Sequence, residues 1–211
     1  IDIAIASVPF LGGGLLVTLL VSGLVVVFSL VAGLALGVAL TYGPIVLTWP
    51  IRVFSDVIRG IPILVLIFFV YYGLPMVGPN LDNFWAAILA LSMFSTAQVI
   101  EISLGALQSI HHGQMEAGKA IGLTFRQRLF SGVVPQALRR FLPPWINAVT
   151  DAVKGSALVS LVGVVDLIQA MQQVAGRTYE ALPVYIVGAI IYFLINYTLS
   201  SLSRTLEARY A

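Results

Sequence analysis

The chain has 211 residues, of which 59% are hydrophobic and only 9% charged, and its mean hydropathy is +1.01. A soluble domain carries about 25% charged residues, so this composition excludes a globular protein surrounded by water and indicates one embedded in lipid. The absence of cysteine excludes disulfides and cysteine metal sites, and a net charge of +2 without a basic run gives no indication of nucleic-acid binding.

The first membrane span is predicted over about residues 10–40, because no charged residue occurs between Ile3 and Ile51. About 20 mostly apolar residues suffice for a helix to cross a bilayer. Gly33 and Gly37 have the spacing that lets two helices approach closely. Glycine is common in membrane helices, however, so the pair alone does not predict a helix contact.

An amphipathic helix is predicted after the first span, over residues 51–59. At helical spacing its apolar residues fall on one side, and four polar residues fall on the other: Arg52, Ser55, Asp56 and Arg59. Gly60-Ile61-Pro62 then interrupts this helix. The apolar stretch that follows predicts a second span over about residues 61–75.

Three more spans are predicted over about residues 84–107, 141–165 and 182–202. The segment between the third and fourth spans, residues 111–135, is the most polar part of the chain. We therefore predict an all-α integral membrane fold of five transmembrane helices, forming one domain over residues 1–211.

The basic residues predict the orientation, because Lys and Arg favour cytoplasmic loops. With five spans, one set of loops contains Arg52, Arg59, Lys119, Arg126, Arg128, Arg139, Arg140, Arg204 and Arg209. The other set contains only Arg177, and Lys154 lies within a span. This asymmetry predicts an N-terminus outside the cell, a C-terminus in the cytoplasm and a cytoplasmic 111–135 segment.

The 111–135 segment is interpreted as two short helices around a break at Gly122, since glycine has no Cβ to restrict its backbone. Apolar residues recur at helical spacing after the break: Phe125, Leu129 and Val133. Arg126 and Arg128 lie between them as polar positions. A bent helical elbow of this kind, with small residues on its first arm, can enter a groove on a partner protein.

The same segment approaches the pattern of a phosphate-binding loop at Gly113 to Lys119. The position where that motif needs a hydroxyl for magnesium is Ala120, and no buried strand precedes it. We therefore expect no direct nucleotide binding by this chain.

Several motifs resemble the permease subunits of ABC importers of polar amino acids. Glu116-Ala117-Gly118, followed by Gly122 and Val134-Pro135, is similar to the "EAA" loop of that family. Gly118 replaces its second alanine, and Gly132 occupies the position of an isoleucine. Further similar segments lie at residues 59–65, 71–75, 154–160 and 206–209. Together the similar segments extend the resemblance over about residues 10–210.

The resemblance implies a fold like that of type I ABC importers, with a cytoplasmic helical coupling loop at 111–135. It implies that two ATP-binding subunits dock on this loop, through Glu116, Ala117, Gly118, Gly122, Arg126 and Arg128. The further implied partners are a second permease copy or close homologue and an extracytoplasmic amino-acid-binding protein. ATP and magnesium would be bound by the partner subunits, so the chain itself is expected to need no cofactor and not to be an enzyme. The resemblance also implies that the chain is located in a bacterial inner membrane.

Ionisable groups inside a membrane are candidates for function, because burying them unpaired is costly. Ser95, Gln98 and Glu101 recur at intervals of three on the third span and predict one polar stripe. Asp151 and Lys154 lie three apart on the fourth span and can pair. For the stripe and for Lys154 we hold two interpretations: they line the substrate pathway, or they make structural contacts between helices.

Two alternative functions are considered. A stand-alone secondary transporter or channel would need no elbow at Glu116–Gly122, and five spans without an internal repeat do not favour it. An intramembrane enzyme would need a nucleophile or metal set, and the sequence contains no such motif. His111 and His112 are adjacent rather than one helical turn apart, so we interpret them as interfacial residues rather than metal ligands.

Overall fold

The computed structural model describes residues 2–111 and 113–210, and within these ranges every regular element is helical. The α-helices are α1 (Asp2–Tyr42), α2 (Ile45–Gly60), α3 (Ile63–Phe68), α4 (Leu74–Val77), α5 (Asn83–Gln108), α6 (Gly113–Ala120), α7 (Phe125–Gln127), α8 (Val134–Gly155), α9 (Leu167–Thr178) and α10 (Ala181–Tyr210). Two π-helical segments, Phe69–Gly73 and Arg128–Val133, and a 3-10 segment, Ser156–Val162, join some of them end to end.

Among the described residues, three helices are long and apolar enough to cross a membrane unbroken: Val8–Tyr42, Asn83–Gln108 and Ala181–Leu206. Two further spans exist if each of two bent pairs counts as one. These pairs are Ile45–Gly60 with Ile63–Val77, bent by 108°, and Phe125–Val162 with Leu167–Thr178, bent by 52°. The predicted all-α membrane fold is confirmed, and the structure contains three to five spans by length and composition.

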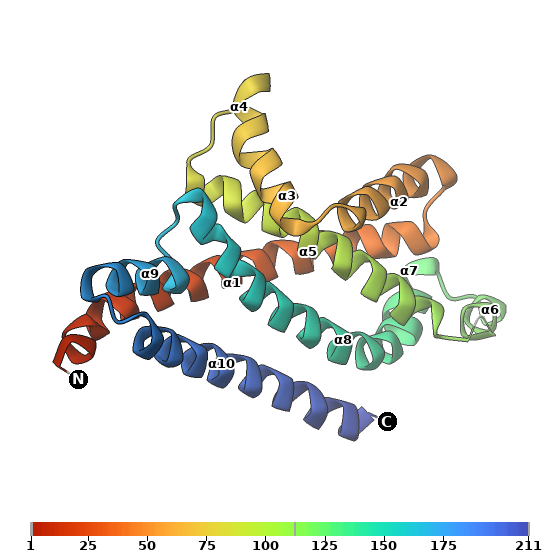
Figure 1. Cartoon of the computed structure of the whole chain (residues 1–211). Helices are drawn as coiled ribbons and strands as arrows, with labels where there is room; N and C mark the ends of the chain where they lie inside the picture. The colour runs from red at the N-terminus through yellow and green to blue at the C-terminus, as the bar shows by residue number, and fades with distance from the viewer. Residues whose placement is uncertain (1, 112, 211) are drawn as a thin grey trace.

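The first bent pair begins earlier than the sequence predicted. The amphipathic helix α2 starts at Ile45, directly after Pro44, and ends at Gly60. Ile61 then adopts an extended conformation, because a proline disfavours the helical backbone at the residue before it. Pro62 itself has no N–H to continue the helix. The chain therefore turns sharply at Ile61 and leaves α2 and α3 as the arms of a V (Figure 1).

The predicted fourth span also differs from the structure in its bounds. Helix α8 begins at Val134 and ends at Gly155, and the chain tightens into the 3-10 segment before it turns at Gly163. Gly163 has a φ of +84°, a backbone conformation that favours glycine. Apolar residues continue through this turn, which is why composition alone predicted an unbroken helix.

The longest helices, α1 and α5, lie side by side through the middle of the molecule (Figure 1). Their closest approach is at Gly33 and Gly37, where an added Cβ would collide with the Cβ atoms of Val99 and Ser103. The two glycines therefore do form a helix contact, against our expectation that their spacing carried no structural meaning. Beside this seam, α3 contributes Ile67 and α5 contributes Leu91 to the largest buried apolar cluster.

A buried carboxylate fixes α9 to α1. Asp166 is fully buried and its Oδ1 accepts the backbone N–H of Gln169 at 2.9 Å, which caps the N-terminus of α9. The hydroxyl of Thr18 on α1 accepts the N–H of Leu167 at 3.0 Å. An added Cβ at Gly14 would lie 2.7 Å from both the carbonyl oxygen of Asp166 and the Cβ of Ala170, so α1 approaches α9 closely here only because residue 14 has no side chain.

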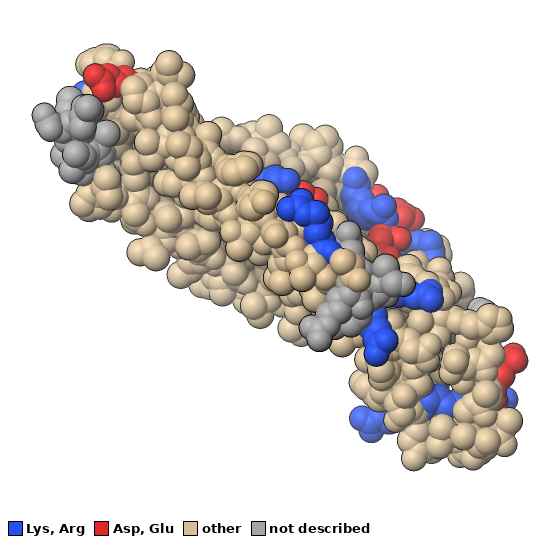
Figure 2. Space-filling model, turned by 90° about the horizontal axis from the view of Figure 1, so that it is seen from below, with Lys and Arg blue, Asp and Glu red and all other residues tan. Residues whose placement is uncertain are grey.

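The two chain termini lie at opposite ends of the molecule, and α6 and α7 lie toward the end that contains the C-terminus (Figure 1). Most of the Lys and Arg side chains visible in Figure 2 lie over this same half, while the remaining surface in that view is largely uncharged. The fold thus separates one basic end, where the 111–135 segment lies, from an opposite end formed by the start of α1, by α9 and by the beginning of α10.

Candidate functional site

The first arm of the 111–135 segment is helix α6, and it ends at the predicted break. The N–H of Leu123 donates to the carbonyl of Gly118 at 3.0 Å, and the N–H of Gly122 donates to that of Lys119 at 3.1 Å. This pair of bonds is the Schellman ending, which needs a left-handed residue after the helix. Gly122 supplies it with a φ of +81°. The prediction of a break at Gly122 is confirmed.

The second arm begins with a capping box. The side chain of Thr124 accepts the N–H of Gln127 at 3.4 Å, and the Gln127 side chain accepts the N–H of Thr124 at 2.9 Å. From Phe125 the chain stays helical into α8, with a π-helical segment just before Pro135. Proline lacks the N–H that would bond back into the preceding turn, and π segments are frequent at functional positions.

Arg128 joins the two arms. Its side chain passes directly over Gly118, where an added Cβ would lie 2.7 Å from Arg128 Cγ. Its Nη1 donates to the carbonyl oxygen of Met115 at 3.2 Å. Glycine at 118, which departs from the family pattern, is therefore matched to the arginine that crosses it. Arg128 lies between the arms, whereas Arg126 is exposed.

The outer surface of the elbow exposes both charged and apolar side chains. Glu116, Ala117 and Lys119 all face away from the protein body, and Ile121 at the bend is 76% exposed. An apolar side chain of that size, presented on a fixed bend beside charged residues, is suited to a partner groove. The sequence analysis did not single out Ile121, because an isoleucine in a hydrophobic chain gives no sign that it is exposed.

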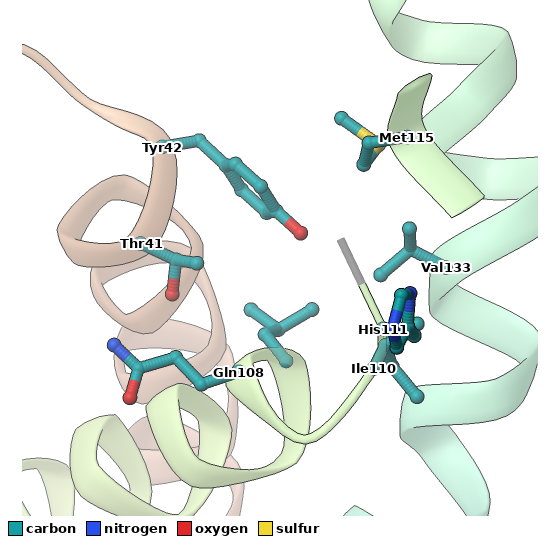
Figure 3. Close-up of a pocket in the computed structure, with 8 residues that line it drawn as sticks. Thr41, Tyr42, Gln108, Ile110, His111, Met115 and Val133 are labelled. Carbon is teal, nitrogen blue, oxygen red and sulfur yellow. The ribbon is translucent and has the colours of Figure 1, made fainter. Parts of the chain in front are cut away.

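A cavity of about 370 Å³ lies behind the elbow, between it and the ends of α1 and α5. Figure 3 shows the hydroxyl of Tyr42 directed into this space, with Met115 and Val133 on the loop side. The Tyr42 ring also meets the ring of Phe125 edge to face, with centroids 5.6 Å apart. The end of α1 is thus in direct contact with the second arm.

His111 closes the cavity at the end of α5, and its Nδ1 accepts the N–H of Gly113 at 3.1 Å. The predicted interfacial position of His112 lies outside the described residues. Within the described ranges, no three His, Asp or Glu side chains gather in a way that could hold a metal ion.

The polar stripe of the third span lies on α5, and the structure gives its members different surroundings. Ser95 is buried, Gln98 is half-buried, and Glu101 is partly exposed beside α2. Glu101 pairs with Arg59 at 3.3 Å and accepts the hydroxyl of Ser55 at 2.9 Å. The stripe therefore includes a polar contact between α2 and α5 that the sequence did not reveal.

Ser55 is placed differently from the sequence interpretation. We assigned it to the polar, outward face of the amphipathic helix, but it is fully buried against α5 together with Ile51 and Ile58. A serine is small enough to pack within an apolar face, and here its hydroxyl is satisfied by Glu101. Asp56 stays exposed as predicted.

Asp151 and Lys154 form the predicted pair on α8, with Oδ1 and Nζ 3.6 Å apart. Both side chains are about 60% exposed in the single chain. An exposed pair at this spacing contributes little to stability. Both charges are therefore accessible to another molecule.

A helical membrane body with an exposed elbow at its basic end is consistent with the transport subunit that the sequence motifs predicted. The family model described as "Binding-protein-dependent transport system inner membrane component" matches residues 29–211. The chain belongs to this family. It is an inner-membrane permease subunit of an ABC transporter for amino acids.

Curated relatives match over nearly the whole chain. The probable glutamine ABC transporter permease protein GlnP of Bacillus subtilis is 38% identical, covering 95% of this chain and 93% of the relative. The glutamine transport system permease protein GlnP of Escherichia coli is 37% identical, covering 96% and 94%. A crystal structure of an amino acid ABC transporter with histidines contains a chain that is 31% identical, with a TM-score of 0.89 over 98% of this chain and 96% of that one.

Proposed function

We propose that this chain forms the translocation pathway of an importer for polar amino acids and couples it to ATP hydrolysis through the elbow at 111–135. The observation that supports the proposal most directly is the elbow itself. Its Schellman ending at Gly122 and the Arg128 bridge over Gly118 hold the two arms at one angle, with Glu116 and Ile121 outward. A fixed, outward shape of this kind can transmit the movement of a partner subunit.

In this proposal two ATP-binding subunits dock on the elbow and bind ATP and magnesium, so that this chain needs no cofactor of its own. Glu116, Ala117 and Arg126 would contact the ATP-binding subunit, because all three are exposed. Gly118, Gly122 and Arg128 would act inside the elbow by keeping its shape. A second permease copy or close homologue completes the pathway, and an extracytoplasmic binding protein delivers the amino acid.

The same arrangement supports one orientation in the membrane. The elbow and most visible basic side chains share one half of the molecule, and basic residues favour the cytoplasm. We therefore place the C-terminus and the elbow in the cytoplasm and the N-terminus outside. Helices α9 and α10 then meet at the outer face.

For the substrate pathway we propose Ser95, Gln98, Glu101 and Lys154. Lys154 and Asp151 offer an exposed ammonium and carboxylate within a bent span, and a zwitterionic substrate carries the complementary pair of charges. Polar amino acids are the substrate class that such groups fit, and the glutamine permeases among the relatives are consistent with it.

The test is a pull-down of the chain with co-expressed ATP-binding subunits of its transporter, repeated with Glu116→Lys. We expect the wild-type chain to retain the ATPase subunit, and Glu116→Lys to lose either this subunit or the dependence of transport on ATP. Asp56→Lys makes the same charge change on α2, outside the elbow, and serves as the control. If the chain purifies alone and moves amino acids in liposomes without ATP, a stand-alone secondary transporter or channel becomes the correct reading.

A further inference from the structure

The turn between α9 and α10 presents a large aromatic side chain to its surroundings. Tyr179 is 93% exposed, the highest value among the large hydrophobic side chains of the described residues. It lies two positions before the membrane-spanning helix α10, at the end of the molecule opposite the elbow. Its ring therefore contributes almost nothing to the packing of this chain.

Tyr179 also has an unfavourable backbone conformation. Its φ of +57° makes it the one residue other than glycine with a positive φ in the described part of the chain. It follows α9 as the left-handed residue of the helix end, and its N–H donates to the carbonyl of Ala175 at 2.9 Å. Glycine or asparagine is usual at such positions, because a Cβ is strained there.

The surrounding contacts hold this turn in one shape. The hydroxyl of Thr178 donates to the carbonyl of Val174 at 2.9 Å and accepts the N–H of Glu180 at 3.3 Å. The guanidinium of Arg177 lies over the ring of Phe10, 5.6 Å from its centroid, which ties the turn to α1. Tyr179 thus projects from a turn that is held by the hydrogen bonds of Thr178 and by the contact of Arg177 with Phe10.

An aromatic residue that adds backbone strain and buries almost none of its surface does not stabilise the chain that carries it. Rigid, exposed tyrosines are typical anchors of protein interfaces, because they bury a large area and lose little conformational entropy. We infer that Tyr179 is an anchor residue of the surface on which the extracytoplasmic amino-acid-binding protein docks. This inference rests on the proposed function, which places the α9–α10 turn at the outer face. The exposed carboxylate of Glu180 beside it supplies a polar rim.

The experiment compares three variants of the complete transporter in lipid nanodiscs: Tyr179→Gly, Tyr179→Asn and Tyr179→Phe. Glycine and asparagine both remove the ring and tolerate the left-handed backbone, and asparagine does so without the extra flexibility of glycine. Phenylalanine keeps the ring and the strain. The probe is the amino-acid-binding protein of the same transporter, loaded with its amino acid. The readouts are its dissociation constant from the transporter and the unfolding midpoint of the transporter alone.

We expect the glycine and asparagine variants to bind the probe about tenfold more weakly or worse, with unfolding midpoints equal to or above that of the wild type. The phenylalanine variant should bind within a few-fold of the wild type. Unchanged affinity in the glycine and asparagine variants would overturn the inference while leaving the proposed function intact.

A second outcome would also overturn it: lower unfolding midpoints of these two variants in nanodiscs, with unchanged affinity, would show that the ring anchors the chain in lipid headgroups. If the wild-type transporter itself captures no binding protein, the proposed function fails, and the inference fails with it. The three results are therefore distinguishable.

Discussion

Arg128 crosses helix α6 at Gly118, and its Cγ occupies the space that a Cβ at that position would need. The same side chain donates to the carbonyl of Met115 at 3.2 Å. One glycine and one arginine, taken from the two arms of the elbow, therefore determine how closely the arms approach.

Gly118→Ala is expected to disturb the elbow, although alanine is the residue of the family pattern. The added methyl group would force Arg128 away from Met115, at a cost of about 1–2 kcal/mol. The measurement is the ratio of ATP hydrolysis to transport in proteoliposomes, which should rise. In the double variant Gly118→Ala/Arg128→Ala the collision is absent, so the effect of the alanine at 118 should largely disappear. Additive losses in the double variant would contradict this account.

Gly122→Ala should weaken the end of α6, since a left-handed backbone costs a residue with a Cβ about 1 kcal/mol more than glycine. Gly122→Pro should be much more severe, because proline cannot adopt a positive φ and would remove the N–H that bonds to Lys119. We expect ATP hydrolysis to become uncoupled from transport in the order wild type, alanine, proline. Gly132, where an added Cβ meets nothing within 4 Å, provides the alanine control.

Gly33→Ala and Gly37→Ala should each destabilise the membrane body by about 1–3 kcal/mol, because the new methyl groups collide with α5. Gly23→Ala lies on the same helix, where nothing lies within 4 Å, and should be neutral or slightly stabilising. Thermal unfolding of the detergent-solubilised chain measures the difference. Equal midpoints for all three variants would show that the seam between α1 and α5 tolerates separation.

Glu101→Gln tests whether the polar contact between α2 and α5 serves transport or structure. The amide oxygen of glutamine can still accept from Ser55, and the lost ion pair with Arg59 is partly exposed, so stability should fall by less than about 1 kcal/mol. We expect assembly to stay intact and amino-acid uptake to fall. Arg59→Gln removes the same pair from its other side and should lower uptake less. Equal uptake by Glu101→Gln and wild type would remove Glu101 from the pathway.

Some features of the site could be predicted from sequence because they depend on neighbours along the chain. The break at Gly122 follows from the conformational freedom of glycine, and the Asp151–Lys154 pair follows from helical spacing. The pairing of Glu101 with Arg59 joins two helices far apart in sequence, and no local pattern indicates it. The position of Ser55 was predicted wrongly for the same reason, since its hydroxyl faces a partner on another helix.

The interruptions of the spans could be predicted only in part. Pro62 indicated the bend after α2, but the 3-10 segment after Gly155 has the same apolar composition as a continuous helix. Composition also could not predict which glycines form contacts between helices. Gly33 and Gly23 have similar apolar neighbours in sequence, and only the position of α5 distinguishes them.

Helix α1 is held at two distant points: Gly14 rests on the backbone of Asp166, and Tyr42 meets Phe125 on the elbow. The intervening helix is unbroken and about 40 Å long at 1.5 Å per residue. Between these two points, Gly33 and Gly37 let α1 pack closely against α5. One continuous helix therefore connects the elbow to the start of α9, so a displacement of Phe125 is expected to be transmitted along α1 to that distant turn.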